Sequence, residues 1–433
     1  MITDRLLLFR NLSREDDSLL KDILSLQEHY LDEATPSKEK QALFADCVGR
    51  ILAMGEAYGF YGNLWDCFLT KILVNDENEY SRSCEIRGTV EGSINKVCLL
   101  DMAVFREMFH LDFQKVSTYL GQDLWDLVET YESVRDRRYT YNRRIRDRIC
   151  DLAVKLKNAA DAQEMKQTLT DFYRDYGVGK LGLHKAFRVE EDEEKKVRIV
   201  PITNIAHVKL EDLVGYELQK EKLRVNTEAF LEGKKANNCL LYGDAGTGKS
   251  SSIKAIMNEY YDRGLRIIEL YKHQFRDLQQ VIAQIKNRNY RFIIYMDDLS
   301  FEEFETDYKY LKAVIEGGLE RKPENVLIYA TSNRRHLVRE ISSDKADRDE
   351  DLHTNDTVQE KLSLAFRFGC QIYYGKPSPA EFKNIVKVLA DRYGITLPEE
   401  ELLLEANKWE LSHGGISGRT AVQFVDDLMT RKR

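Results

Sequence analysis

The sequence predicts an α/β domain preceded by an all-α domain, and two observations support this prediction. From residue 1 to about residue 175 the chain has a single proline, and apolar residues recur at three- and four-residue intervals, as at Met102, Phe105 and Phe109. This spacing is typical of amphipathic helices. Beyond about residue 210, short apolar runs alternate with helical patterns. Such alternation is typical of a parallel sheet covered by helices.

The composition argues against several classes of protein. The 433 residues are 43% hydrophobic and 32% charged, and the net charge is -8. This charge argues against a protein that mainly coats nucleic acid or an anionic membrane, because such proteins need a positive field. No run of about 18 apolar residues predicts a membrane span, and the apolar run near the start is too short for a signal peptide. The seven cysteines form no CxxC pair, so we expect reduced thiols in a cytoplasmic protein.

The segment between the two predicted domains differs from both in its composition. Within residues 176–210, apolar and β-branched residues flank the charged tip EEDEEKK. This pattern predicts a two-stranded ribbon, with a flexible surface linker as the alternative for the tip. The turn that follows contains Val214 and Gly215 ahead of a predicted helix. By position, these two residues are expected to supply backbone and apolar contacts to an adenine ring.

A glycine-rich loop is the chemically most informative stretch. The apolar run from Cys239 to Tyr242 leads into GDAGTGKSS, which has the phosphate-binding pattern GxxxxGK[ST] between a predicted strand and a predicted helix. Glycines in this pattern let successive backbone N–H groups face an anion. Lys249 is expected to reach the β and γ phosphates of ATP, and Ser250 to complete a Mg²⁺ shell. The predicted loop residues are Gly243, Asp244, Ala245, Gly246, Thr247, Gly248, Lys249, Ser250 and Ser251. The alternative is a plain glycine-rich turn.

Polar residues end two later apolar runs. The run RFIIYMDDLS places Asp297 and Asp298 where a buried parallel strand would emerge at the carboxyl edge of the sheet. Asp297 is expected to hold Mg²⁺ through water, and Asp298 to act as general base toward the attacking water. The run NVLIYATSN ends in Asn333, which is expected to orient that water or touch the γ-phosphate. The charged residues that follow are Arg334, Arg335 and His336, for which a loop surface is the competing interpretation.

Two arginines near the C-terminus are candidate residues of the nucleotide site. Arg367 precedes the apolar strand predicted at Cys370 to Tyr374, from where it could reach the nucleotide of a neighbouring subunit. Arg419 begins the last predicted helix, where the helix dipole disfavours a cation, so a bound anion would explain it. Three helices are predicted beyond Pro377.

The ordered set of motifs resembles an AAA+ ATPase over about residues 205 to 433. More closely, LEDLVGYELQK, MDDLSFEE, NVLIYATSNRRH and EKLSLAFRFG resemble an uncharacterised bacterial AAA+ family, classed as a domain of unknown function. The resemblance implies a five-stranded parallel P-loop NTPase core with a helical lid. It also implies that Lys249 and Ser250 belong to Walker A, Asp297 and Asp298 to Walker B, Asn333 to sensor 1, Arg367 to the arginine finger and Arg419 to sensor 2. The domains expected on this basis are a helical domain (1–175), a ribbon or linker (176–210), a core (211–376) and a lid (377–433).

Two departures from the family pattern limit what the resemblance implies. The usual base in this superfamily is glutamate, whereas position 298 is aspartate, one methylene shorter, so slow hydrolysis is expected; Glu302 and Glu303 are nearby alternatives. Members that thread polypeptide carry an aromatic-apolar-glycine loop after the second strand. Here Tyr271 to Phe275 reads YKHQF, without a glycine, so threading is not supported.

The expected function is Mg-dependent ATP hydrolysis at a site between subunits of a homo-oligomer, driving the remodelling of a protein partner bound by the N-terminal domain. The first alternative is a nucleotide-gated binding module with little hydrolysis. The second is a nucleic-acid-associated loader or remodeller, suggested by seven arginines and two tyrosines within Arg135 to Arg148. Pairing of these arginines with nearby acids on a solvated helix is the favoured interpretation of that cluster.

Overall fold

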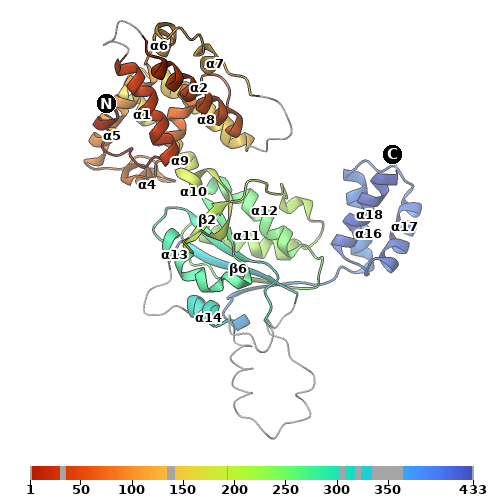
Figure 1. The fold of residues 1–433 in the computed structure, drawn as a ribbon. Helices are drawn as coiled ribbons and strands as arrows, with labels where there is room; N and C mark the ends of the chain where they lie inside the picture. Colours follow the sequence, from red (N-terminus) through yellow and green to blue (C-terminus); the bar gives the residue numbers. More distant parts are fainter. Residues whose placement is uncertain are drawn as a thin grey trace. The chain divides into compact units, whose positions relative to one another are not determined.

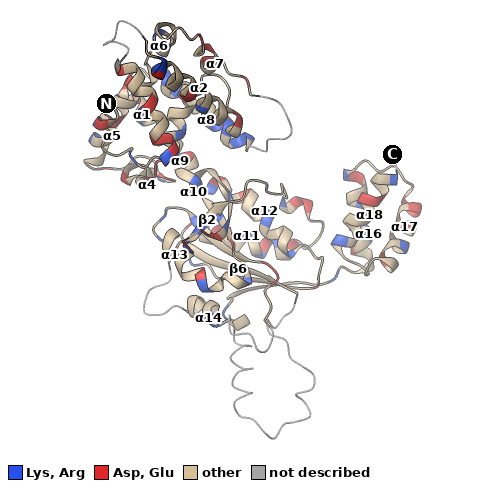
Figure 2. Ribbon diagram, viewed as in Figure 1, with Lys and Arg blue, Asp and Glu red and all other residues tan. Residues whose placement is uncertain are grey.

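The chain divides into two compact units, Met1–His184 and Lys185–Arg433, which are described separately. The structure, a computed structural model (Figure 1), describes residues 2–29, 36–133, 142–192, 194–301, 308–316, 323–333 and 364–431. No helix in these ranges combines the length and apolarity needed to cross a bilayer. Lysines, arginines and acidic residues are spread over the elements of both units (Figure 2).

The N-terminal unit is built from helices alone, apart from one isolated β-bridge between Gly62 and Tyr131, in the part of the chain that the structure describes. Its helices are η1 (Ile2–Arg5), α1 (Arg14–His29), α2 (Lys38–Tyr58), α3 (Leu64–Asn75), α4 (Glu79–Cys84), α5 (Ile94–Phe109), α6 (Phe113–Tyr119), α7 (Asp126–Glu129), α8 (Arg143–Lys157), α9 (Ala162–Tyr176) and α10 (Gly179–Leu183). Several begin at a side chain that accepts a hydrogen bond from the first turn, such as Ser37 before α2 and Asn63 before α3. Such N-caps satisfy donors that have no partner inside the helix.

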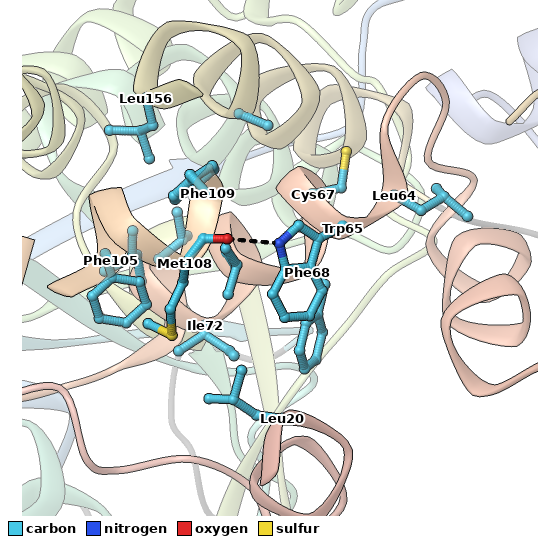
Figure 3. Close-up of a cluster of buried hydrophobic side chains, with 14 of the residues drawn as sticks. Leu20, Leu64, Trp65, Cys67, Phe68, Ile72, Phe105, Met108, Phe109 and Leu156 are labelled. Atoms are coloured by element: carbon cyan, nitrogen blue, oxygen red, sulfur yellow. Dashed lines mark hydrogen bonds between the residues drawn. The ribbon is translucent and has the colours of Figure 1, made fainter. Parts of the chain in front are cut away.

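Helix α3 forms the centre of this unit, since every residue from Leu64 to Val74 is buried. Figure 3 shows Trp65 and Phe68 of α3 among apolar side chains that include Phe105 of α5 and Leu156 of α8. The indole Nε1 of Trp65 donates to the backbone oxygen of Met108 at 3.0 Å. A buried indole loses no hydrogen bond in this way, and its ring contributes a large apolar area to the core.

The C-terminal unit is built on one seven-stranded sheet in the order β2-β1-β4-β5-β6-β3-β7. The strands are β1 (Ala186–Glu191), β2 (Val197–Pro201), β3 (Cys239–Gly243), β4 (Leu265–Glu269), β5 (Arg291–Met296), β6 (Val326–Ser332) and β7 (Cys370–Tyr374). The five strands from β4 to β7 in this order are mutually parallel, so the α/β fold class predicted from the sequence is confirmed. The β1–β2 hairpin extends the sheet, because β1 pairs with β4 in parallel and with β2 antiparallel.

Helices cover both faces of the sheet (Figure 1). The helical elements of the core are η2 (Leu210–Asp212), α11 (Glu217–Leu231), α12 (Lys249–Tyr260), η3 (Tyr261–Arg263), η4 (Lys272–Asp277), α13 (Leu278–Ile285) and α14 (Tyr308–Glu316). Leu223 of α11 and Ile256 of α12 share one buried cluster with Leu241, Tyr295 and Tyr329 of the strands. Because side chains alternate between the faces of a strand, Tyr295 and Tyr329 lie on the face that α11 and α12 cover.

The region predicted as a lid, called the lid below, is a three-helix cluster of α16 (Pro379–Arg392), α17 (Glu399–Ser412) and α18 (Gly418–Arg431) with its own apolar core. Helix α16 starts with a capping box between Ser378 and Glu381 and has a proline in its first turn, which is a favoured helix start. The YKHQF segment winds into η4 directly after β4 and Leu270.

Candidate functional site

The site predicted from the sequence lies at the carboxyl ends of the parallel strands, where a pocket of about 650 Å³ opens. The glycine-rich loop forms one wall, and the ends of β5 and β6 form another. The turn from Asp212 to Tyr216 and the lid residues Ile385 and Leu389 supply apolar surface. A pocket of this size fits a nucleotide, whose base would lie against the apolar walls and whose phosphates would lie at the polar end.

The glycines of the loop are required by its geometry. Gly243 has a φ of 135°, and a Cβ there would lie 2.1 Å from the backbone oxygen of Tyr374. Gly248 has a φ of 92°, and a Cβ there would lie 2.5 Å from Leu213 Cδ2. Helix α12 begins at the next residue. The N–H groups of its first turn have no partner within the helix, so they favour an anion at this place.

Lys249 points into the loop, and 6% of its surface is exposed. Its Nζ donates to Gly243 O at 3.0 Å, to Asp244 O at 2.6 Å and to Asn333 Oδ1 at 3.0 Å. Burial lowers the pKa of Lys249, and the nearby Asp244, Asp298 and Asp297 act in the opposite direction. A phosphate group is a stronger acceptor than a carbonyl and would give this desolvated cation a charged partner.

Asp297 is held by two hydroxyl groups. Ser250 Oγ donates to its Oδ1 at 2.8 Å, and Thr331 Oγ1 donates to the same oxygen at 2.5 Å. Burial acts to raise the pKa of Asp297, but the nearby hydroxyl groups of Thr331, Tyr295 and Ser250 and the charge of Lys254 outweigh it, so the pKa lies below its usual value. The carboxylate is therefore charged at neutral pH.

The donor set around Asp297 fits a magnesium ion that also binds phosphate. Ser250 and Asp297 offer hydroxyl and carboxylate oxygens, which hard cations prefer. In the described residues, no group of three or more His, Cys, Asp or Glu side chains could hold a metal by itself. A cation here would thus need oxygens from water and phosphate, which is how Mg²⁺ binds in nucleotide sites.

Asp298 has an unusual backbone conformation, with a φ of 50°. Its N–H donates to Thr331 Oγ1 at 2.9 Å, and its Oδ1 accepts from Asn333 Nδ2 at 2.8 Å. The left-handed region is uncommon for a residue with a side chain, and such outliers cluster at functional sites. Since Asn333 also accepts from Lys249, one amide connects the loop lysine to the second acid.

The lid touches the loop directly. Arg419 N donates to Gly246 O at 3.1 Å, and a Cβ on Gly246 would come within 3.0 Å of Ser417 Oγ. At the other end of the loop, Asp244 N donates to Tyr374 O, and Asp244 Oδ2 accepts from Lys376 N, each at 3.0 Å. The loop is thus bonded to α18 and to the segment that leads into α16.

The structure brings most of the predicted site residues together. Those that line the pocket are Val214, Ala245, Gly246, Thr247, Gly248, Lys249, Ser250, Ser251, Asp297, Asp298, Asn333 and Arg419. Gly243 and Asp244 instead line a neighbouring cavity of about 420 Å³ together with Asn333. Gly215 is not among the pocket residues; its φ of 82° turns the chain so that Tyr216 lines the pocket instead. Arg367 lies just before β7 and does not line the pocket of its own chain.

Sequence reasoning missed two residues that lie at the acidic end of the site. Thr331 bonds both Asp297 and Asp298 and is buried. Its signal was available, because a polar residue two positions before Asn333 faces the same side of a strand. Tyr295, two residues before Asp297, is also buried. A tyrosine in an apolar run is ordinary for a strand, so the sequence carried no signal for it.

Other predicted residues lie outside the described ranges. These are Glu302, Glu303, Arg334, Arg335, His336 and the first part of the arginine cluster. In the described part, Arg146 bonds Asp147 and lies over the Tyr61 ring, while Arg148 lies 3.8 Å from the ring centroid of Tyr176. Both arginines contact residues of the N-terminal unit.

The C-terminal part of the chain matches a known protein family. Residues 182–432, more than half of the chain, match the family described as "Protein of unknown function (DUF815)". The chain belongs to this family. The sequence-based identification of an uncharacterised family, classed as a domain of unknown function, is thereby confirmed.

Individual relatives are distant. The Thermotoga maritima RuvB Holliday junction branch migration motor aligns with 52% of this chain and 66% of its own, at 16% identity and a TM-score of 0.36. A single-residue variant of the same motor gives 16% identity, the same coverage and a TM-score of 0.37. The large subunit of replication factor C from Staphylothermus marinus is 38% identical over 74 residues, which is 17% of each protein. This chain thus matches less than two thirds of the length of either protein.

Proposed function

We propose that this DUF815 protein binds ATP with Mg²⁺ and hydrolyses it slowly at a site completed by a second subunit. The observation that carries the proposal is the hydrogen-bonded line from Lys249 through Asn333 to Asp298, beside the Ser250–Asp297 pair and at the end of one pocket. A cation, a metal-binding pair and an acid are the groups that phosphoryl transfer to water requires.

Each residue has a role in this mechanism. The N–H groups at the start of α12 and the Lys249 ammonium bind the phosphates, and the apolar turn with Val214 and Tyr216 contacts the base. Ser250 and Asp297 would hold Mg²⁺, which neutralises charge that develops on the transferring phosphoryl group. Asp298 accepts the proton of the attacking water through the carboxylate oxygen that Asn333 does not bond.

Arg367 is proposed to act on the site of a neighbouring copy. It does not line the pocket of its own chain, and an arginine supplied in trans neutralises charge on the equatorial oxygens in the transition state. Arg419 is proposed to contact the phosphates from the lid, since it lines the pocket next to Gly246. A homo-oligomer follows from the first of these roles.

The domain roles are also part of the proposal. We assign residues 1–175 to a partner-binding helical domain, 176–210 to the connecting ribbon, 211–376 to the ATPase core and 377–433 to the lid. All seven cysteines are free, which is consistent with a reducing cytoplasmic location. The partner is proposed to be a protein, because Arg146 and Arg148 of α8 already contact Asp147 and the Tyr176 ring.

The experiment is a measurement of ATPase rate against protein concentration for the wild type and Arg367→Ala. A shared site predicts a specific rate that rises with concentration and falls at least about 10-fold in the variant. Arg198→Ala, which removes an exposed arginine on β2, is the matched control. A rate that depends on neither concentration nor Arg367 would exclude the shared site.

The second candidate is a nucleotide-gated binding module with little hydrolysis. The short side chain of Asp298 and its bond to Asn333 favour it, because a carboxylate held by an amide is less available to water. Single-turnover measurements of ATP hydrolysis distinguish the two functions. Bound ATP that is released without being hydrolysed indicates the binding module.

A further inference from the structure

The hydroxyl group of Tyr295 is the feature of the site that the proposed mechanism does not use. Tyr295 is 4% exposed, and its hydroxyl oxygen has no hydrogen-bond partner within the described residues. Other buried tyrosines of the same sheet are satisfied. Tyr329 bonds Asn226 at 2.9 Å, and Tyr374 donates to Ser252 at 3.0 Å.

A buried polar group without a partner destabilises the folded state. Phenylalanine would fill the same space on β5 without that cost. The hydroxyl is therefore difficult to explain by packing alone. A buried hydroxyl group without a partner at a functional site indicates that its hydrogen bond forms only when the site is occupied.

The surroundings of the hydroxyl identify that partner. Tyr295 lies on the α12 face of β5 and precedes Asp297 by two residues, so both side chains point to the same face. Its hydroxyl lies near Ser250, Asp297 and Thr331 but makes no hydrogen bond of regular geometry to them. These three residues form the proposed metal end of the pocket.

In the structure, Ser250 and Thr331 donate to the same oxygen of Asp297. Magnesium at Ser250 would require a lone pair of its hydroxyl oxygen, which restricts the direction of its bond to Asp297. The carboxylate must also orient a metal-bound water. A further donor on the same face would then hold it in place.

We propose that Tyr295 is a positioning residue of the metal site, whose hydroxyl donates to the Asp297 carboxylate when Mg²⁺ and nucleotide are bound. This inference rests on the proposed function, because it assumes the Ser250–Asp297 magnesium site. Tyr295 touches neither metal nor phosphate in this role; it acts through Asp297. Its removal changes the metal requirement more than the affinity for the nucleotide itself.

The test compares Tyr295→Phe with the control Tyr329→Phe, a buried tyrosine on the neighbouring strand that bonds α11 instead. ATP binding is measured by calorimetry in EDTA and then at increasing Mg²⁺ concentrations, with Mn²⁺ paramagnetic resonance as a second measurement of metal affinity. Tyr295→Phe is expected to raise the half-saturating Mg²⁺ and Mn²⁺ concentrations about 10-fold, the usual effect of losing a group that orients a metal ligand. Affinity for ATP in EDTA and thermal stability without ligand are expected to be no lower than in wild type.

Two results would overturn the inference. One is an unchanged metal dependence in Tyr295→Phe, and the other is an equal shift in both variants, which would indicate a general loss of packing. Failure of the proposed function has a different signature, because wild-type protein would then bind no ATP with or without metal, and the role of Tyr295 would be rejected together with it.

Discussion

The side-chain amide of Asn333 donates to Asp298 Oδ1 at 2.8 Å while its oxygen accepts from Lys249 at 3.0 Å. One residue at the end of β6 therefore contacts both the phosphate-binding cation and the candidate base. The backbone of Asp298, with a φ of 50°, is held in this position by Thr331 as well. The proposed chemistry at the γ-phosphate depends on this line of contacts, which ends at Asp298.

Asp298→Asn is expected to lower ATP turnover by about 10²- to 10⁴-fold while ATP affinity stays within about 3-fold of wild type, because only the proton acceptor is lost. Single-turnover hydrolysis and equilibrium binding measure the two quantities. An unchanged turnover in this variant would assign the base to another residue.

Lys249→Ala is expected to weaken ATP binding at least about 10-fold, because the ammonium group is the charged donor of the loop. Titration with ATP in the presence of Mg²⁺ measures the effect. Lys235→Ala is the control, because Lys235 is an exposed lysine that does not line the pocket. Equal affinities in the two variants would contradict a phosphate role for Lys249.

Asp66 in the N-terminal unit predicts a pH dependence of stability. Burial raises the pKa of Asp66 to about 7, although Lys157 lies 3.9 Å away. The folded protein then keeps this proton at pH values where the unfolded chain, with a pKa near 3.8, has lost it. Ionisation of Asp66 therefore destabilises the fold progressively as the pH rises from about 4 to about 7.

Asp66→Asn removes this penalty. The variant is expected to be more stable than wild type at pH 8 by about 1 to 3 kcal/mol, with the difference vanishing near pH 4. Urea unfolding at the two pH values measures it. A variant that is less stable at pH 8 would indicate that the charged carboxylate stabilises the start of α3 through the helix dipole instead.

Arg266 is a second buried charge, with 1% of its surface exposed. Its guanidinium carbon lies 4.1 Å from the Tyr261 ring centroid and 4.6 Å from that of Tyr290, and Nη1 donates to two backbone oxygens. Arg266→Ala is expected to lower the free energy of unfolding by about 2 to 4 kcal/mol, since cation–π contacts and hydrogen bonds are lost together. Denaturant titration measures this. Arg188→Ala, at an exposed ion pair, should change it by less than about 1 kcal/mol.

The sequence predicted the phosphate loop and the acidic strand end because both depend on local spacing. Gly243 and Gly248 mark backbone conformations that other residues resist, and Asp297 stands out at the end of an apolar run. The contact of Thr331 with Asp297 depends on β5 and β6 being neighbours in the sheet, and a single sequence does not contain that pairing. Only the face of β6 that Thr331 occupies could be read from its spacing to Asn333. The ribbon was predicted from its composition, but its place beside β4 was not, since strand order is set by packing across the whole domain.

The bonds of the glycine-rich loop to Arg419 and Lys376 have a mechanical consequence. Arg419 lies at the start of α18, the last lid helix, and Lys376 lies shortly before α16, the first. The lid is therefore hydrogen-bonded to the loop at two separate points. Movement of the lid relative to the loop would require these hydrogen bonds to break or the loop to change its shape. We therefore expect a change in the shape of the loop to move the lid helices with it.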